Sequence, residues 1–168
     1  MNALTISDLE QDTLGHQHLT FVVQEETYAV DTLAVREILE FGQLTQVPRM
    51  PACIRGVINL RGAVVPVIDL EARFGGSSTQ VGPRTCVVIL EVPTGDDLQV
   101  LGVVVDAVSE VLEIAPGDIR PAPSFGSRLR PDFIAGMVKS GSGFVVVLDV
   151  PRVLDIEELA GLAARSTS

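Results

Sequence analysis

The feature that most constrains the fold of this chain is an internal repeat. Residues 51–74 align with residues 131–154 at a constant offset of 80, and six of the 24 aligned positions are identical. Unrelated stretches of this composition would give about one or two identities at a fixed offset. The identical pairs are Pro51 with Pro131, Ile54 with Ile134, Gly56 with Gly136, Val65 with Val145, Val67 with Val147 and Asp69 with Asp149. The same small unit therefore occurs twice.

The match continues upstream, where Glu37–Glu40 aligns with Glu110–Glu113 at an offset of 73. Each unit would span about 60 to 70 residues with about five strands, and a unit that small buries too little apolar surface to be stable alone. Two copies packed against each other would share a core and leave a groove along their junction. Such clefts between modules are common recognition sites.

The residue types indicate an all-β fold. Valine and isoleucine occupy 35 positions, whereas there are only six phenylalanines and one tyrosine, and β-branched side chains favour strands. Two strands, Val57–Leu60 and Ala63–Leu70, flank a two-residue turn, and a further hairpin is expected between Thr85 and Val105. Helices are expected only as short segments, at Glu71–Phe74 and near the C-terminus at Asp155–Ala164.

We expect four segments along the chain. They are a mobile N-terminal tail (1–16), a first β subdomain (17–80), a second β subdomain (81–154) and a C-terminal helix with a tail (155–168). A glycine- and serine-rich stretch at 75–83 separates the subdomains. The pattern leaves open which subdomain each terminal strand joins, because terminal strands can cross between modules.

Composition excludes several classes of function. A net charge of −10 argues against nucleic acid, which needs cationic contacts. The first residues have neither the basic nor the apolar region of a signal peptide, so we expect no leader, and no apolar run reaches membrane-spanning length. Cys53 and Cys86 lie too far apart to form a redox motif. We expect a cytoplasmic protein with free buried thiols and no direct membrane insertion.

No set of residues suggests catalysis, a cofactor or a metal. His16 and His18 lie beside the polar tail, where such a pair is usually incidental. Asp69 and Asp149 could be imagined as a carboxylate pair, but their equivalent repeat positions are better explained as caps of two short helices. We expect a protein that is not an enzyme.

One tetrapeptide, Asn59–Gly62, has no counterpart in the second half of the chain, where Lys139–Ser142 occupies the aligned positions. Positions shared by both halves are explained by folding, so a feature of one half alone is a better functional candidate. Within it, the Arg61 guanidinium can form a two-pronged contact with a carboxylate, and Glu37 is one candidate. The alternative is a solvated turn arginine.

The segment Pro51–Gly62, followed by Pro66–Leu70 and Phe74, closely resembles the signature of the CheW coupling proteins of bacterial chemotaxis. The resemblance covers about residues 17 to 160. It implies two SH3-like five-stranded β-barrels related by a pseudo-two-fold axis, which agrees with the repeat.

The resemblance also implies a non-catalytic adaptor. It would link the cytoplasmic tips of chemoreceptors (methyl-accepting chemotaxis proteins) to the regulatory domain of the histidine kinase CheA in signalling arrays, and its inter-barrel groove would receive the receptor's helical hairpin. By position, the resemblance assigns the partner-binding surface to Val35, Glu37, Arg61 and Gly62, and the groove wall to Val105 and Val108. For Val105, plain core packing is an alternative of at least equal weight.

Two alternatives come from other classes of protein. A small-molecule-binding β-barrel sensor would have a sizeable closed pocket and a ligand-dependent melting temperature. A homo-oligomeric scaffold would self-associate through its barrels, whereas an adaptor is expected to be monomeric when dilute.

Overall fold

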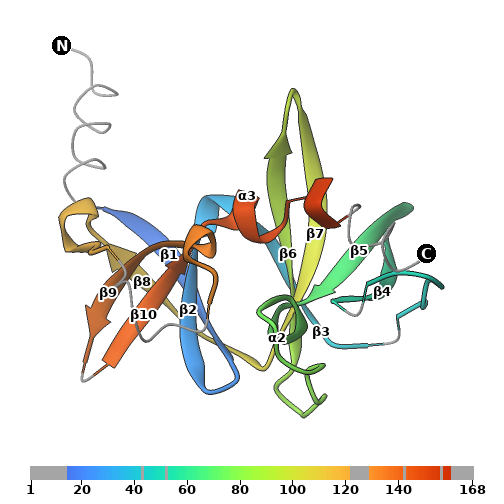
Figure 1. Cartoon of the computed structure of the whole chain (residues 1–168), viewed down its shortest axis with the longest axis horizontal. Coiled ribbons are helices and arrows are strands. Elements are labelled where there is room, and N and C mark those ends of the chain that lie inside the picture. Colours follow the sequence, from blue (N-terminus) through green and yellow to red (C-terminus); the bar gives the residue numbers. More distant parts are fainter. Residues whose placement is uncertain are drawn as a thin grey trace.

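The computed structural model describes residues 15–42, 44–51, 53–121, 129–141, 143–155 and 157–159, and this part of the chain is almost entirely β-structure (Figure 1). Its strands are β1 (His16–Val23), β2 (Glu26–Asp31), β3 (Val35–Glu40), β4 (Ile54–Leu60), β5 (Ala63–Asp69), β6 (Cys86–Thr94), β7 (Asp97–Val105), β8 (Ala107–Ile114), β9 (Ile134–Ser140) and β10 (Gly143–Leu148). Its short helices are η1 (Thr32–Ala34), α2 (Leu70–Arg73), η2 (Pro116–Asp118), η3 (Pro131–Phe133) and α3 (Val150–Val153).

The strands form two five-stranded sheets. One, which we call barrel A, has the order β8-β1-β2-β10-β9, and the other, barrel B, has the order β3-β6-β7-β5-β4. Figure 1 shows the two sheets beside each other, with α3 above their junction. The all-β fold with two five-stranded units is therefore confirmed.

The two sheets are copies of each other in topology. Each has one parallel pair, β5 with β7 in barrel B and β10 with β2 in barrel A. Each also has a bulge at the same repeat position, between Ile54 and Gly56 in β4 and between Ile134 and Gly136 in β9. Equivalent strands in equivalent order relate the barrels by the expected pseudo-two-fold symmetry.

The shared glycines permit a close approach of backbone. A Cβ at Gly56 would lie 2.7 Å from the carbonyl oxygen of Thr45, and a Cβ at Gly136 would lie even closer to the Ile119 side chain. At both sites a connecting segment crosses the sheet edge and forms an isolated bridge to the residue after the glycine. The glycines were kept in both units because only they leave room for this crossing.

The shared aspartates cap helices, as predicted. Asp69 Oδ1 accepts a hydrogen bond from the Ala72 N–H, and Asp149 Oδ1 accepts one from the Arg152 N–H, each at 3.3 Å. Asp69 is also completely buried and accepts hydrogen bonds from Arg55 Nη1 and from Thr79, all at 2.8 Å. This network fixes the glycine- and serine-rich segment against barrel B.

The barrels do not coincide with the consecutive units 17–80 and 81–154 expected from the sequence. Barrel B is formed by one continuous stretch, 35–105, whereas barrel A combines β1 and β2 with β8, β9 and β10. The physical reason is that β2 pairs with β10 across nearly the whole chain length, so the N-terminal hairpin completes the sheet begun by the C-terminal strands. Barrel A is thus a circularly permuted copy of barrel B.

The expected terminal segments are only partly within the described residues. Residue 16 of the expected tail already belongs to β1, and residues 1–14 lie outside the described part. Of the expected C-terminal helix, residues 157–159 are helical, and residue 156 and the stretch 160–168 lie outside it.

The largest apolar core lies between the barrels. This inter-barrel core includes Phe21 of barrel A and Leu90 and Val103 of barrel B, while two smaller clusters fill the separate barrels. In β6 the side chains alternate, because Val88, Leu90 and Val92 face the inter-barrel core and Val87 and Ile89 face the interior of barrel B. Burial on both faces explains the uninterrupted apolar runs.

We expect Phe21→Ala to lower the free energy of unfolding by about 3 to 5 kcal/mol, because it empties the shared core. Urea unfolding should still be one cooperative transition, coincident by circular dichroism and by Tyr28 fluorescence. Phe144 is the matched control, since it is 60% exposed, and Phe144→Ala should cost about 0.5 kcal/mol or less. Two separated transitions for Phe21→Ala would contradict a shared core.

Candidate protein-interaction site

Arg61 lies at the tip of the β4–β5 hairpin. The turn contains only Arg61 and Gly62, with φ angles of 53° and 89°, as in the turns that best fit the twist of a two-residue hairpin. The Gly62 N–H donates to Asn59 Oδ1 at 2.9 Å. The tetrapeptide found in one half of the sequence therefore builds a tight turn that holds an arginine in a backbone conformation usually left to glycine.

The guanidinium of Arg61 forms a two-pronged ion pair with Glu37 of β3. Arg61 Nη1 donates to Glu37 Oε2 at 2.7 Å, and Arg61 Nη2 donates to Glu37 Oε1 at 3.2 Å. This is the pairing that the sequence raised as one candidate, and it is confirmed. Since β3 and β4 are the two edges of the barrel B sheet, the pair joins those edges.

The ion pair keeps Glu37 ionised. The hydrogen bond from Arg61 lowers the pKa of the Glu37 carboxyl; burial opposes this, and the charges of Arg61 and Arg36 add to it. The Arg61 side chain is 69% exposed, and exposed pairs contribute little to folding stability. An exposed, preformed guanidinium–carboxylate pair is better suited to recognising a partner than to holding the fold.

We call Glu37, Arg61 and Gly62 the Arg61 surface. Ile38, the next residue in β3, and Val64, three residues after Arg61, are both exposed. Because successive residues of a strand point to opposite faces, Ile38 lies on the other face of β3 from Glu37.

A groove of about 610 Å³ lies between the barrels on the side of α3. Leu33 of η1 and Leu98 of β7 line it and are mainly exposed, so apolar area faces solvent there. The repeat predicted a groove at the junction. Its other apolar lining residues include Ala34, Pro93, Ile114, Pro116, Ile119, Ala135, Val147, Leu148, Val150 and Pro151.

Several polar side chains that line the groove also make contacts within the protein. Asp31 Oδ1 accepts from the Leu33 N–H at 2.9 Å, and Asp149 caps α3. Glu91 lies 3.7 Å from Arg36. His18 Nδ1 lies 3.1 Å from the carbonyl oxygen of His16. The groove is therefore mainly apolar, with the carboxylates of Asp31, Glu91 and Asp149 among its lining.

The valines assigned by resemblance do not form one surface. Val105 is completely buried in the inter-barrel core, so plain core packing is what the structure shows. Val35 and Val108 occupy equivalent repeat positions and are half-buried against the same core. Neither Val105 nor Val108 lines the groove, and both read in sequence like any other strand valine.

Sequence reasoning predicted none of the residues that line the groove, including its exposed leucines Leu33 and Leu98. For Leu33 a signal was available in its position, because it lies beside polar turn residues, where a leucine contributes nothing to a strand pattern. The sequence could not show that η1 and the β6–β7 hairpin meet at the junction of the barrels.

The two cysteines are free thiols, as expected. Cys53 is buried, and burial raises the pKa of its thiol. Cys86 differs from the expectation, because it is only half-buried. Within the described ranges, no cluster of three His, Cys, Asp or Glu side chains could hold a metal ion, and no helix is long and apolar enough to cross a membrane.

Comparison with known proteins decides the family. The profile of the CheW-like domain matches residues 17–158 of this chain. The chain belongs to the CheW family. The match covers both barrels and all residues of the Arg61 surface, and it agrees with the resemblance carried by Pro51–Gly62.

Relatives with the CheW name match over most of their length. The chemotaxis protein CheW of Klebsiella aerogenes is 36% identical over 156 residues, which is 93% of this chain and 92% of that protein. The chemotaxis protein CheW of Rhizobium meliloti is 33% identical, over 86% of this chain and 90% of that protein. The crystal structure of the scaffolding protein TtCheW from Thermoanaerobacter tengcongensis superposes with a TM-score of 0.76 and 30% identity, covering 84% of this chain and 89% of that one.

We expect Arg61→Gln to raise the pKa of the Glu37 carboxyl toward its ordinary value, because the hydrogen bond that lowers it is removed. A carbon-13 titration of the Glu37 side chain measures this directly. In the unaltered protein the pair persists as pH falls, until it is lost at a pH below the ordinary carboxyl pKa. An unchanged titration midpoint in Arg61→Gln would show that the pair does not persist in solution.

Proposed function

We propose that this CheW-family chain is a non-catalytic adaptor that couples chemoreceptor cytoplasmic tips to the regulatory domain of CheA. Family membership supports the proposal, and so do the names of the relatives, which are chemotaxis proteins and a scaffolding protein. The adaptor would act in the cytoplasm, within arrays at the receptors. Its net charge of −10 favours a monomer when dilute, since like charges repel.

The observation that carries the proposal is that two recognition surfaces share no residue. The groove lies between the barrels beside α3, whereas the Arg61 surface is formed by β3 and the β4–β5 hairpin of barrel B. Two partners could therefore be bound at once by one body whose barrels are joined by a common core. Simultaneous binding is what coupling requires.

The groove suits the receptor's helical hairpin. Its apolar lining and its exposed leucines, Leu33 and Leu98, would receive the apolar face of an amphipathic helix. Asp31, Glu91 and Asp149, which also line the groove, would favour basic residues beside that face. Apolar contact would supply most of the affinity.

The Arg61 surface suits a barrel-shaped neighbour in the kinase. The Arg61 guanidinium is already held in place by the tight turn and by Glu37, so it loses little side-chain entropy when a partner binds. It can bind a partner carboxylate as well as Glu37. Charged contacts of this kind set register and association rate more than raw affinity. Val64, which is exposed near the start of β5, would provide apolar contact beside the turn.

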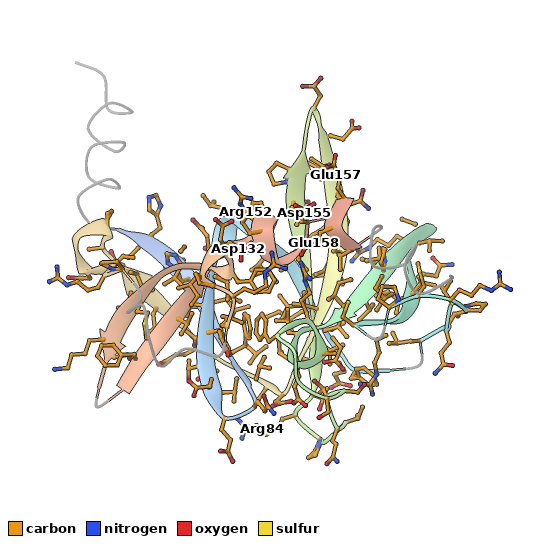
Figure 2. The ribbon with its side chains drawn as sticks, in the orientation of Figure 1. Arg84, Asp132, Arg152, Asp155, Glu157 and Glu158 are labelled. Carbon is orange, nitrogen blue, oxygen red and sulfur yellow. The ribbon has the colours of Figure 1, made fainter. Side chains whose placement is uncertain are left out.

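We expect Arg61→Glu to weaken capture of the CheA regulatory domain by about tenfold or more in a pull-down. Receptor capture should be retained if the two surfaces act separately, and the circular dichroism spectrum should be unchanged. Arg84→Glu is the charge-matched control, because Arg84 is exposed at the opposite end of barrel B from α3 (Figure 2). Undiminished binding of both partners would remove Arg61 from the site.

The complementary variant is Leu33→Glu, which places a charge on a side chain that is 82% exposed and should not disturb folding. We expect it to weaken capture of receptor tips by about tenfold while leaving the kinase domain bound. Loss of kinase binding alone would mean that the assignment of partners to surfaces is reversed. A ligand-dependent rise in melting temperature, without either partner, would instead favour a small-molecule sensor.

A further inference from the structure

Arg73 is a nearly buried cation that connects the two barrels. Its side chain, in α2 of barrel B, is 4% exposed. Arg73 Nε donates to the Val153 carbonyl oxygen at 2.8 Å, and Arg73 Nη2 donates to Glu158 Oε2 at 2.8 Å. Its guanidinium carbon lies 4.7 Å from the ring centroid of Phe133. Phe133 directly precedes β9 of barrel A, and Val153 and Glu158 follow β10 of barrel A. Each contact therefore connects barrel B with a segment attached to barrel A.

The position of this link is set by the repeat. Arg73 and Val153 occupy equivalent positions at the offset of 80. When a residue contacts its own counterpart, the contact lies at the two-fold axis that relates the copies. Because the counterpart of Arg73 is a valine, the bond to the Val153 carbonyl has no symmetric copy. The junction thus has one asymmetric polar link inside a symmetric apolar core.

A second guanidinium completes the cluster without crossing the junction. Arg130 also lies over Phe133, 4.3 Å from the ring centroid, and it pairs with Asp132 and Glu158. Hydrogen bonds from Arg130 and then from Arg73 lower the pKa of the Glu158 carboxyl, which stays charged. Figure 2 shows Asp132 and Glu158 near the centre of the view, where the two sheets meet.

The helix α3 connects this cluster to the groove. Val150 and Pro151, at the start of α3, line the groove, and Val153, at its end, accepts the hydrogen bond from Arg73. We propose that Arg73 is a positioning residue that holds α3 against barrel B and so fixes the angle between the barrels and the width of the groove. The identity of the partner in the groove depends on the function proposed above, whereas the fixed angle between the barrels does not.

The energetics favour a role in geometry over a role in stability. Burying a guanidinium is costly unless it is paired. Replacing Arg73 by an apolar residue leaves no unpaired buried carboxylate, because Glu158 is 32% exposed and keeps its ion pair with Arg130. Apolar packing across the junction is nondirectional and tolerates small rotations. Two directed hydrogen bonds from one planar group do not tolerate them.

The test is an NMR measurement of residual dipolar couplings on the full chain. Couplings from the strands of barrel A and barrel B should fit one alignment tensor in the unaltered protein. In Arg73→Met the two barrels should require different tensors, with the melting temperature little changed. The matched control is Arg130→Gln, which removes a neighbouring guanidinium from the same phenylalanine and the same carboxylate but should retain one tensor.

A single shared tensor in Arg73→Met, with the same relative orientation as in the unaltered protein, would overturn the proposal. If Arg73→Met does not fold, Arg73→Lys serves in its place, because an ammonium keeps the charge but cannot form both directed bonds in the plane of one guanidinium. The same criterion applies to it: separate tensors support the proposal and one unchanged tensor overturns it.

Binding then separates this inference from the proposed function. Arg73→Met should weaken capture of receptor tips by about threefold to tenfold and leave capture of the CheA regulatory domain unchanged, since the Arg61 surface belongs to barrel B alone. Separate tensors with unchanged receptor capture would support the positioning role and contradict receptor docking in the groove. Loss of kinase capture would contradict the prediction that Arg73→Met affects the groove alone.

Discussion

The apolar core between the barrels is the interaction on which the rest of the structure depends. Each barrel encloses only a small cluster of its own, while the largest set of buried side chains lies between them. Strands such as β6 and β7 are buried on both faces, which is why they read as unbroken valine-rich runs. The groove and its walls exist only because this core holds the two barrels together.

The roles proposed for single side chains fall at positions where the two halves differ. The shared residues, among them Gly56 with Gly136 and Asp69 with Asp149, make backbone crossings and helix caps in both barrels. Two of the arginines that have no counterpart in the other half are Arg61 and Arg73. Arg61 aligns with Gly141 and forms an exposed pair, and Arg73 aligns with Val153 and links the barrels across the pseudo-two-fold axis.

The repeat also explains how the chain closes on itself. Because barrel A takes β1 and β2 from one end of the chain and β8, β9 and β10 from the other, unfolding of either end would open the same barrel. Barrel B, continuous in sequence, carries the Arg61 surface and one wall of the groove. The surface proposed to meet the kinase is thus on the barrel that is independent of the chain ends.

Sequence reasoning succeeded where local chemistry decides the structure. The turn at Arg61 and Gly62, its contact with Glu37, and the caps at Asp69 and Asp149 all depend on a few nearby atoms. The family, too, could be recognised from one segment, because its residues act together in a single hairpin and helix start.

It failed where strand pairing over long distances decides. The sequence of a strand does not identify the strand with which it pairs, so the alternation of apolar and polar residues could not reveal the permuted strand composition of barrel A. The strand β8 was missed, although the match of Glu110–Glu113 with Glu37–Glu40 pointed to it. The resemblance assigned Val105 to a groove wall, with core packing as the alternative. A core valine and a groove valine have the same sequence pattern, so only packing distinguishes them.

If one rigid body binds two partners at separate places, a mixture of all three proteins contains a ternary complex, and its stoichiometry is the most direct test. Sedimentation velocity of this chain with a chemoreceptor tip and the CheA regulatory domain should reveal a single species that contains all three. Displacement of one partner by the other, with only pairwise complexes at every ratio, would contradict the account.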